Sequence, residues 1–384
     1  MPHINSVFSQ TTQLIPWDVF DSSVCAYKAD HRVRRLRTRD QFLALLYGQL
    51  SGAASLREIE TGLRSHQNRL YHAGGRDIRR STLADANAKR PFEVYRDVFA
   101  ALVTRARPGL RRKLRGAVRL IDATSISLSS HSASWVPRKA GHYRAKVHVV
   151  YDPVGVLPVH ADITHQNVND ITPARALELE PGATYVFDLG YYSYEWWHKL
   201  NTQGCLFVTR LKTTTRLRGA QKRPCPKDGL IEFVQTGTLP PSIMRGRNPY
   251  VDRVREVHVR CDDGRLLRLV TNDLDSPPEE IAALYKQRWE IELFFKWIKQ
   301  NLRIRRFIGR GERAVKTQVY IALIAFLLIR ECHAMQKHIK KLQAFSRVLR
   351  LNLMHRKPVT QLITNPEDPP PETTPQLSLK LKKC

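Results

Sequence analysis

Three carboxylates are the residues whose types and positions suggest chemistry. Asp122 follows the apolar run Val118–Ile121, and Asp188 follows the run Tyr185–Phe187. Glu292 lies in the segment YKQRWEIELFFKWIKQNL, whose pattern is typical of a helix. A buried carboxylate without a partner is costly, so acids beside apolar strands need a reason. Functional sites collect at strand ends in open α/β sheets, although capping of a turn or helix is an alternative for either aspartate.

The helical segment carries Glu292 on one face together with residues that bind phosphate. Tyr285 is followed by Arg288, Glu292 and Lys299, at three, seven and fourteen positions after it. At about 100° per residue, the four fall within a stripe roughly 60° wide, whereas Glu290 points elsewhere. A stabilising i, i+4 pair would explain Arg288 and Glu292 alone. It does not explain Tyr285 and Lys299 on the same stripe.

Carboxylates that converge from different elements suit hard divalent cations such as magnesium. Two such ions, held about 4 Å apart, activate an attacking water or 3′-hydroxyl and stabilise the leaving oxygen of a phosphodiester. We therefore predict that Asp122, Asp188 and Glu292 are both metal ligands and catalytic residues. The sequence contains no H-E-x-x-H, no G-x-S-x-G and no Walker loop that would indicate a different chemistry.

The charge of the chain points to a polyanionic partner. The 384 residues include 63 Lys plus Arg against 35 Asp plus Glu, a formal net charge of +28, which favours nucleic acid. The longest apolar stretch, Val319–Ile329, is roughly half of the ~20 residues that a membrane span needs, so no membrane partner is expected. The N-terminus resembles no secretory signal, and the scattered cysteines favour reduced thiols. We expect a cytoplasmic, nucleoid-associated bacterial protein.

The pattern along the chain predicts four segments. Residues 1–113 are basic and helical, with a capping box in SLREIETGL. Residues 114–204 and 274–355 alternate short strands and helices and predict an α/β core, with one long helix from residue 279 to about 302. Residues 205–273 read as a β-strand-rich insertion. Residues 356–384 are proline-rich and are expected to be a disordered tail.

These residues resemble the DDE transposases of insertion sequences, specifically the insertion-sequence-four group that includes Tn-five-like enzymes. The motif of that group, Y-x2-R-x3-E-x6-K, is matched by Tyr285, Arg288, Glu292 and Lys299 without a gap. Four fixed positions at this spacing form a specific motif.

Other blocks of the sequence are similar to the same group. Ile121–Thr124 and Asp188–Tyr191 resemble its two aspartate blocks, the second usually read as D-R-G-Y. Leu189 departs from that pattern, which removes a phosphate contact but leaves the metal ligand. Lys146–His148 and His165–Asp170 are also similar, each weakly. The resemblance covers roughly residues 30 to 335.

The resemblance implies a ribonuclease H-like catalytic core, with the β-rich insertion between Asp188 and Glu292 and the helical DNA-binding region before it. It implies a Mg²⁺-dependent enzyme with two ions, for which Mn²⁺ would substitute, that performs cut-and-paste DNA transposition. Tyr285, Arg288 and Lys299 would grip DNA phosphates near the transposon end and help hold a hairpin intermediate. The N-terminal region would recognise the terminal inverted repeats, and a homodimer would join two ends to target DNA in a synaptic complex.

Two other functions fit the charge. A catalytically inactive DNA-binding derivative that acts as a repressor would share the basic N-terminal region, but it would have no need of three intact carboxylates. An RNA-binding or ribosome-associated protein fits the charge alone, yet the sequence shows none of the clustered aromatics or modules expected of one.

Overall fold

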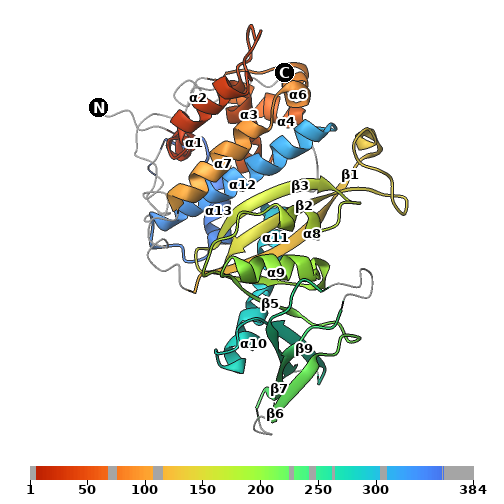
Figure 1. The fold of residues 1–384 in the computed structure, drawn as a ribbon. Coiled ribbons are helices and arrows are strands. Elements are labelled where there is room, and N and C mark those ends of the chain that lie inside the picture. The colour runs from red at the N-terminus through yellow and green to blue at the C-terminus, as the bar shows by residue number, and fades with distance from the viewer. Residues whose placement is uncertain are drawn as a thin grey trace, which may run out of the picture.

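The protein is described here by a computed structural model, which covers residues 6–67, 76–106, 116–224, 229–241, 248–261, 264–302, 309–356 and 358. A helical layer lies over one end of a long β-sheet, and the sheet extends away from it toward the opposite end of the molecule (Figure 1). The tail predicted from residue 356 lies almost entirely outside the described residues.

One nine-stranded sheet runs through the described part of the chain in the order β3-β2-β1-β4-β5-β9-β8-β7-β6. Its strands are β1 Val118–Leu128, β2 Tyr143–Asp152, β3 Leu157–His165, β4 Thr184–Phe187, β5 Leu206–Arg210, β6 Arg218–Pro224, β7 Ile231–Thr238, β8 Arg253–Arg260 and β9 Leu266–Thr271.

The sheet changes direction at its centre. β1, β2 and β3 form an antiparallel meander, whereas β1, β4 and β5 run parallel to one another. β5 then pairs antiparallel with β9, and β9, β8, β7 and β6 continue antiparallel to the far edge. The segment 205–273 is therefore rich in strands, but it extends the core sheet, and its first strand, β5, belongs to the parallel centre. The predicted α/β class with a β-rich insertion is confirmed.

Helices cover both faces of the central strands because side chains alternate between the faces. On one face, Leu120 and Val186 join the core beneath α11 and α12; on the other, Ile121 and Phe187 join a second core beneath α9. The helices after β1 are α8 Ile171–Arg175, α9 Tyr194–Thr202, α10 Pro278–Gln287, α11 Trp289–Asn301, α12 Glu312–Ala334 and α13 Leu342–Leu351.

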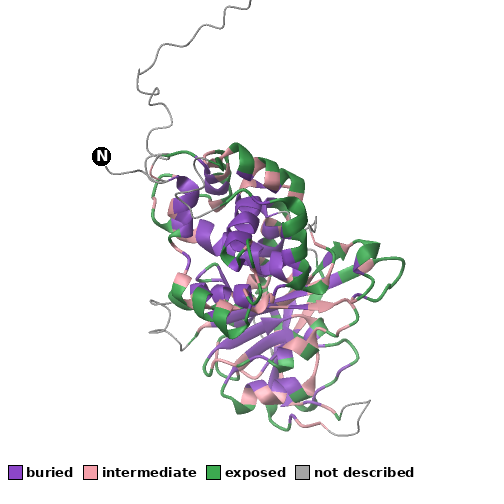
Figure 2. Ribbon diagram, turned by 90° about the horizontal axis from the view of Figure 1, so that it is seen from above, coloured by how far each residue is buried: buried purple, intermediate pink, exposed green. Residues whose placement is uncertain are grey.

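The N-terminal region is helical, as predicted, but it does not fold apart from the sheet. Helices α3, α6 and α7 pack against α12, and buried residues of the helical region and of β1 to β3 belong to one hydrophobic core. Figure 2 shows this buried interior running from the helical layer into the sheet. The helices of this region are α1 Val7–Thr12, α2 Trp17–Ala26, α3 Thr38–Ser51, α4 Leu56–Ser65, α6 Arg80–Lys89 and α7 Glu93–Ala106.

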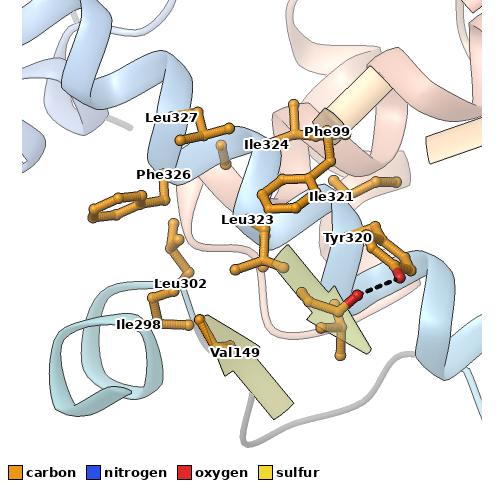
Figure 3. Packing of buried hydrophobic residues seen from close by; sticks show 14 of the residues in the cluster. Phe99, Val149, Ile298, Leu302, Tyr320, Ile321, Leu323, Ile324, Phe326 and Leu327 are labelled. Carbon is orange, nitrogen blue, oxygen red and sulfur yellow. Dashed lines mark hydrogen bonds between the residues drawn. The ribbon is translucent and has the colours of Figure 1, made fainter. Parts of the chain in front are cut away.

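Helix α12 is the apolar stretch of the sequence and lies at the centre of this core. Its side chains meet Phe99 of α7, Val149 of β2 and Ile298 of α11 (Figure 3). The Tyr320 hydroxyl donates a hydrogen bond to the Ala161 carbonyl of β3 at 2.9 Å. Among the residues described, no helix is long and apolar enough to cross a membrane.

The single helix predicted from residue 279 to 302 is wrong in one respect, because the chain forms two helices that meet at Arg288. The Arg288 amide donates to the Tyr285 carbonyl at 3.1 Å, so the helical bonding tightens at this point. The two helices also pack on different neighbours: α10 lies against β5 and β8, whereas α11 lies against β1 and α13. Packing on different parts of the sheet explains the break.

Candidate active site

The register of the central strands brings Asp122 and Asp188 together. β1 and β4 are parallel, and the last pair of partners in their ladder is Ile121 and Phe187. The next residue on each strand is an aspartate. By alternation, Asp122 shares a face with Leu120 and Asp188 shares a face with Val186, which is the face covered by α11.

The predicted strand-end position is right for Asp188 and wrong for Asp122. β4 ends at Phe187, directly before Asp188, but β1 continues to Leu128. The reason is the other neighbour of β1: its pairing with β2 persists as far as Leu128 and Tyr143. Asp122 therefore lies at the end of the β1–β4 ladder, in the middle of its strand.

Arg288 connects the strand carboxylate to the helix carboxylate. Its Nη2 lies 2.7 Å from Glu292 Oε1, and its Nη1 lies 3.7 Å from Asp122 Oδ2. The Arg288 side chain is 15 % exposed, and its Nε is buried with no hydrogen-bond partner in the described part of the protein. The guanidinium therefore spans the two acids and retains an unused donor.

The site raises the pKa of Asp122 to about 6. Burial is the largest cause, since it disfavours the charged form, and the negative charges of Asp188 and Glu292 act in the same direction. The Ala123 amide, which donates to Asp122 Oδ1 at 2.8 Å, and the Arg288 guanidinium oppose the rise. Asp122 therefore holds its charge less readily than an ordinary aspartate.

A tight turn after β4 holds Asp188. Its Oδ1 accepts a hydrogen bond from the Gly190 amide at 2.8 Å, and its carbonyl accepts one from the Thr209 hydroxyl of β5 at 3.3 Å. A Cβ at position 190 would lie 2.9 Å from Asp188 Oδ1 and 3.4 Å from Asp170 Oδ2. A larger residue here would have to displace the Asp188 carboxylate, and Asp170 is a fourth carboxylate beside the turn.

Asp170 belongs to a polar cluster that borders the site and that the sequence motifs indicated only weakly. Lys146 Nζ donates to Asp170 Oδ1 at 2.7 Å and to the Val168 carbonyl at 3.0 Å. The buried His148 shares a hydrogen bond of 2.8 Å with the Thr164 hydroxyl. The two weakly similar blocks of the sequence, Lys146–His148 and His165–Asp170, contain these residues. The sequence therefore marked them, but it did not assign them a function.

The other two residues of the helical motif lie on the same helices. Arg288 lies above the Tyr285 ring, with its Cζ 5.8 Å from the ring centre. Burial raises the pKa of Tyr285, and the positive charges of Arg288 and Arg210 oppose that rise. Lys299 is half-buried on α11, two turns after Glu292. The structure thus joins Tyr285, Arg288 and Glu292 to the two aspartates.

The donor set fits divalent cations, although no group of three His, Cys, Asp or Glu side chains in the described residues is already arranged to hold a metal ion. The fit rests on chemistry: carboxylate oxygens are hard ligands, and burial together with repulsion from the other two acids raises the pKa of Asp122. A cation would relieve that repulsion. Asp122, Asp188 and Glu292 are the residues that would hold it.

Comparison with known proteins identifies the family of this chain. The family described as transposase DDE domain matches residues 114–328, which include all three carboxylates. A family described only as a domain of unknown function matches residues 3–76.

Individual relatives point the same way. A protein of Sinorhizobium fredii named as transposase y4zB is 36 % identical over 75 % of this chain and 80 % of its own length. A protein of Geobacillus stearothermophilus, named as a transposase for an insertion sequence element, is 29 % identical over 65 % of this chain and 66 % of its own. Among solved structures, the piggyBac transposase synaptic complex with hairpin DNA matches 91 % of this chain and 78 % of that one, at 12 % identity and a TM-score of 0.44.

Proposed function

We propose that this chain, which belongs to the transposase DDE domain family, is the transposase of an insertion sequence. Its catalytic residues would be Asp122, Asp188 and Glu292. The insertion-sequence-four group fits its relatives. The observation that carries the residue assignment is the β1–β4 register, which places two aspartates side by side on the face of the sheet where Arg288 and Glu292 lie.

The three carboxylates would hold two Mg²⁺ ions, or Mn²⁺ in their place. When bound, these ions would supply activation of a water or 3′-hydroxyl and neutralise the charge that develops on the phosphate. The protein supplies position: Asp122 from the rigid strand β1, Asp188 from the turn fixed by Gly190, and Glu292 from α11. Because the pKa of Asp122 is about 6, this carboxylate is mainly ionised only above that pH.

Tyr285, Arg288 and Lys299 would bind phosphates of the DNA end. Arg288 is suited to this task because its guanidinium already lies between Asp122 and Glu292, with its Nε donor unused. A guanidinium presents its donors in a fixed fork that matches phosphate oxygens. It would therefore orient the scissile strand against the acids.

The whole reaction requires two DNA ends and a target. We infer that the N-terminal region recognises the terminal inverted repeats and that two copies of the chain pair in the synaptic complex. The freed 3′-hydroxyl would then attack target DNA at the same acids. The net charge of +28 supports this partner, because phosphate neutralisation dominates affinity for DNA.

The test is cleavage of a duplex that carries the element's end. Asp122→Asn, Asp188→Asn and Glu292→Gln should each reduce Mg²⁺-dependent nicking by roughly 1,000-fold or more, while binding of the same duplex is retained. Glu290→Gln is the matched control, because Glu290 lies in the first turn of the same helix and no contact of the described residues joins it to either aspartate. Full cleavage by any of the three variants would remove that residue from the active site. Binding without nicking by the unaltered protein would favour the repressor function.

A further inference from the structure

A basic groove lies in the helical layer, outside the catalytic site. Its walls come from three places: the loop after α2, the last turns of α6 and the first turn of α12. It is open and has a volume of about 890 Å³. Six of its lining residues are exposed cations, namely Lys28, Arg32, Arg34, Arg35, Lys89 and Arg313.

These six cations, which we call the groove cations, are not neutralised by the protein. None of them forms an ion pair with another residue in the part of the chain that the structure describes. Among the lining residues that the structure describes, Asp85 is the single carboxylate. Like charges held together without counter-ions repel one another, so this arrangement favours an anionic partner.

The groove is held by buried contacts below the groove cations. Arg90, which is 7 % exposed, donates to Gln41 Oε1 at 2.9 Å and also bonds the Leu36 carbonyl of the loop. Asp30 accepts hydrogen bonds from both the amide and the hydroxyl of Thr38, each at 2.7 Å. These contacts tie Asp30 and Leu36 of the loop to α3 and to the end of α6, so the exposed side chains start from a fixed backbone.

The loop also contains two cations in an uncommon backbone conformation. Lys28 and Arg32 have φ angles of 51° and 57°, in the left-handed region that few non-glycine residues adopt. Such conformations persist where surrounding structure enforces them, and they cluster at functional sites.

We propose that this groove binds the phosphate backbone of duplex DNA without reading its sequence, and the proposal rests on the proposed function in taking DNA as the partner. Lysine and arginine contacts to phosphates position a protein on DNA and supply most of its sequence-independent affinity. Cations dominate the lining that the structure describes, where Asp85 is the one carboxylate. The groove therefore contributes affinity and register on any duplex. It also assigns a role to part of the segment matched only by a family of unknown function.

The experiment removes three groove cations without disturbing the loop. Arg34→Ala, Arg35→Ala and Lys89→Ala are combined, and Lys28 and Arg32 are left in place because of their left-handed backbone. The control combines Lys337→Ala, Lys340→Ala and Lys341→Ala, which removes the same charge from exposed positions outside the groove. Thermal unfolding of both variants shows that each is folded.

Binding is measured with the full chain over a range of salt concentrations, on an element-end duplex and on a scrambled duplex of equal length. The groove variant should bind both duplexes at least tenfold more weakly. The slope of log affinity against log salt should fall by about two to three, since each phosphate contact contributes about 0.9 to that slope. The control should change neither quantity by as much.

Three outcomes would overturn the groove proposal: unchanged affinity and slope, a loss confined to the element-end duplex, or a loss for a structured RNA with none for DNA. These outcomes can be distinguished from a failure of the proposed function, because the proposed function is tested by measuring DNA nicking. If the unaltered protein nicks DNA and the groove variant binds DNA normally, only the groove proposal is wrong. If the unaltered protein never nicks DNA but the groove variant loses salt-dependent binding, only the catalytic proposal is wrong.

Discussion

Two carboxylates on the same sheet have their pKa values moved in opposite directions. Asp122, on the central strand β1, has a pKa raised to about 6. Glu256, on β8 of the insertion, has a pKa lowered to about 2. Burial raises the pKa of both, so their neighbours decide the difference.

The neighbours of Glu256 are donors. Its side chain is fully buried, and it accepts hydrogen bonds from His258 at 2.6 Å, from Arg268 at 2.6 Å and from Gln235 at 2.5 Å. These bonds outweigh the effect of burial and favour the charged form. Glu256 is therefore a satisfied structural acid that joins β7, β8 and β9.

The neighbours of Asp122 are mainly other acids. Asp188 and Glu292 raise its pKa, and only one amide and a guanidinium 3.7 Å away oppose them. A cluster of three acids that reduces the stability of the fold is typical of a binding or catalytic site. The comparison teaches that burial alone does not identify a functional carboxylate. The charge of the neighbouring groups does.

The largest expected effect on stability tests the structural side of this comparison. Glu256→Gln would leave the Arg268 guanidinium buried without its anion and should reduce the free energy of unfolding by about 3 kcal/mol. Urea unfolding measures it, with the exposed Glu232→Gln on β7 as the control. Because the folded pKa lies below the ordinary 4.5, the advantage of wild type should be complete above pH 4.5 and disappear as the pH falls toward 2. An equal loss in the control would show that Glu256 is not special.

The next effect has the opposite sign and tests the functional side. Asp122→Asn should raise the free energy of unfolding by up to about 2–3 kcal/mol at pH 8 without divalent ions, because it removes a strained charge. The folded pKa lies above the ordinary 3.8, so wild type loses stability as the pH rises from 3.8 through 6. The gain of the variant should therefore shrink toward zero below pH 4. Thermal unfolding across this pH range checks it, and a variant less stable than wild type at pH 8 would contradict the comparison.

The smallest effect on stability concerns the turn that holds Asp188. Gly190→Ala would place a Cβ 2.9 Å from Asp188 Oδ1, so the carboxylate must shift by a few tenths of an ångström. Nicking should fall roughly tenfold, while the free energy of unfolding changes by less than about 1 kcal/mol. Gly311→Ala is the control, since a Cβ there meets nothing within 4 Å. If both variants nick equally well, the close approach at Gly190 has no role in positioning Asp188.

Much of the fold was predictable because local pattern carried it. Apolar runs such as that ending at Phe187 marked strands, and the Val319–Ile329 stretch marked a buried helix, as α12 proves to be. Periodicity could not reveal the break at Arg288, since it arises from the packing of α10 and α11 on different strands. It also could not show that the N-terminal helices share a core with the sheet.

The candidate site divides in the same way. The sequence by itself determined which residues are chemically apt, and helical spacing alone placed Arg288 and Glu292 within reach of each other, where the structure finds them 2.7 Å apart. Only the tertiary structure decided that Asp122 lies beside Asp188 and that both face α11, because strand register joins segments far apart in the chain. The pKa of Asp122 and the open basic groove were also decided by the tertiary structure, since burial and charge density depend on how distant segments pack together.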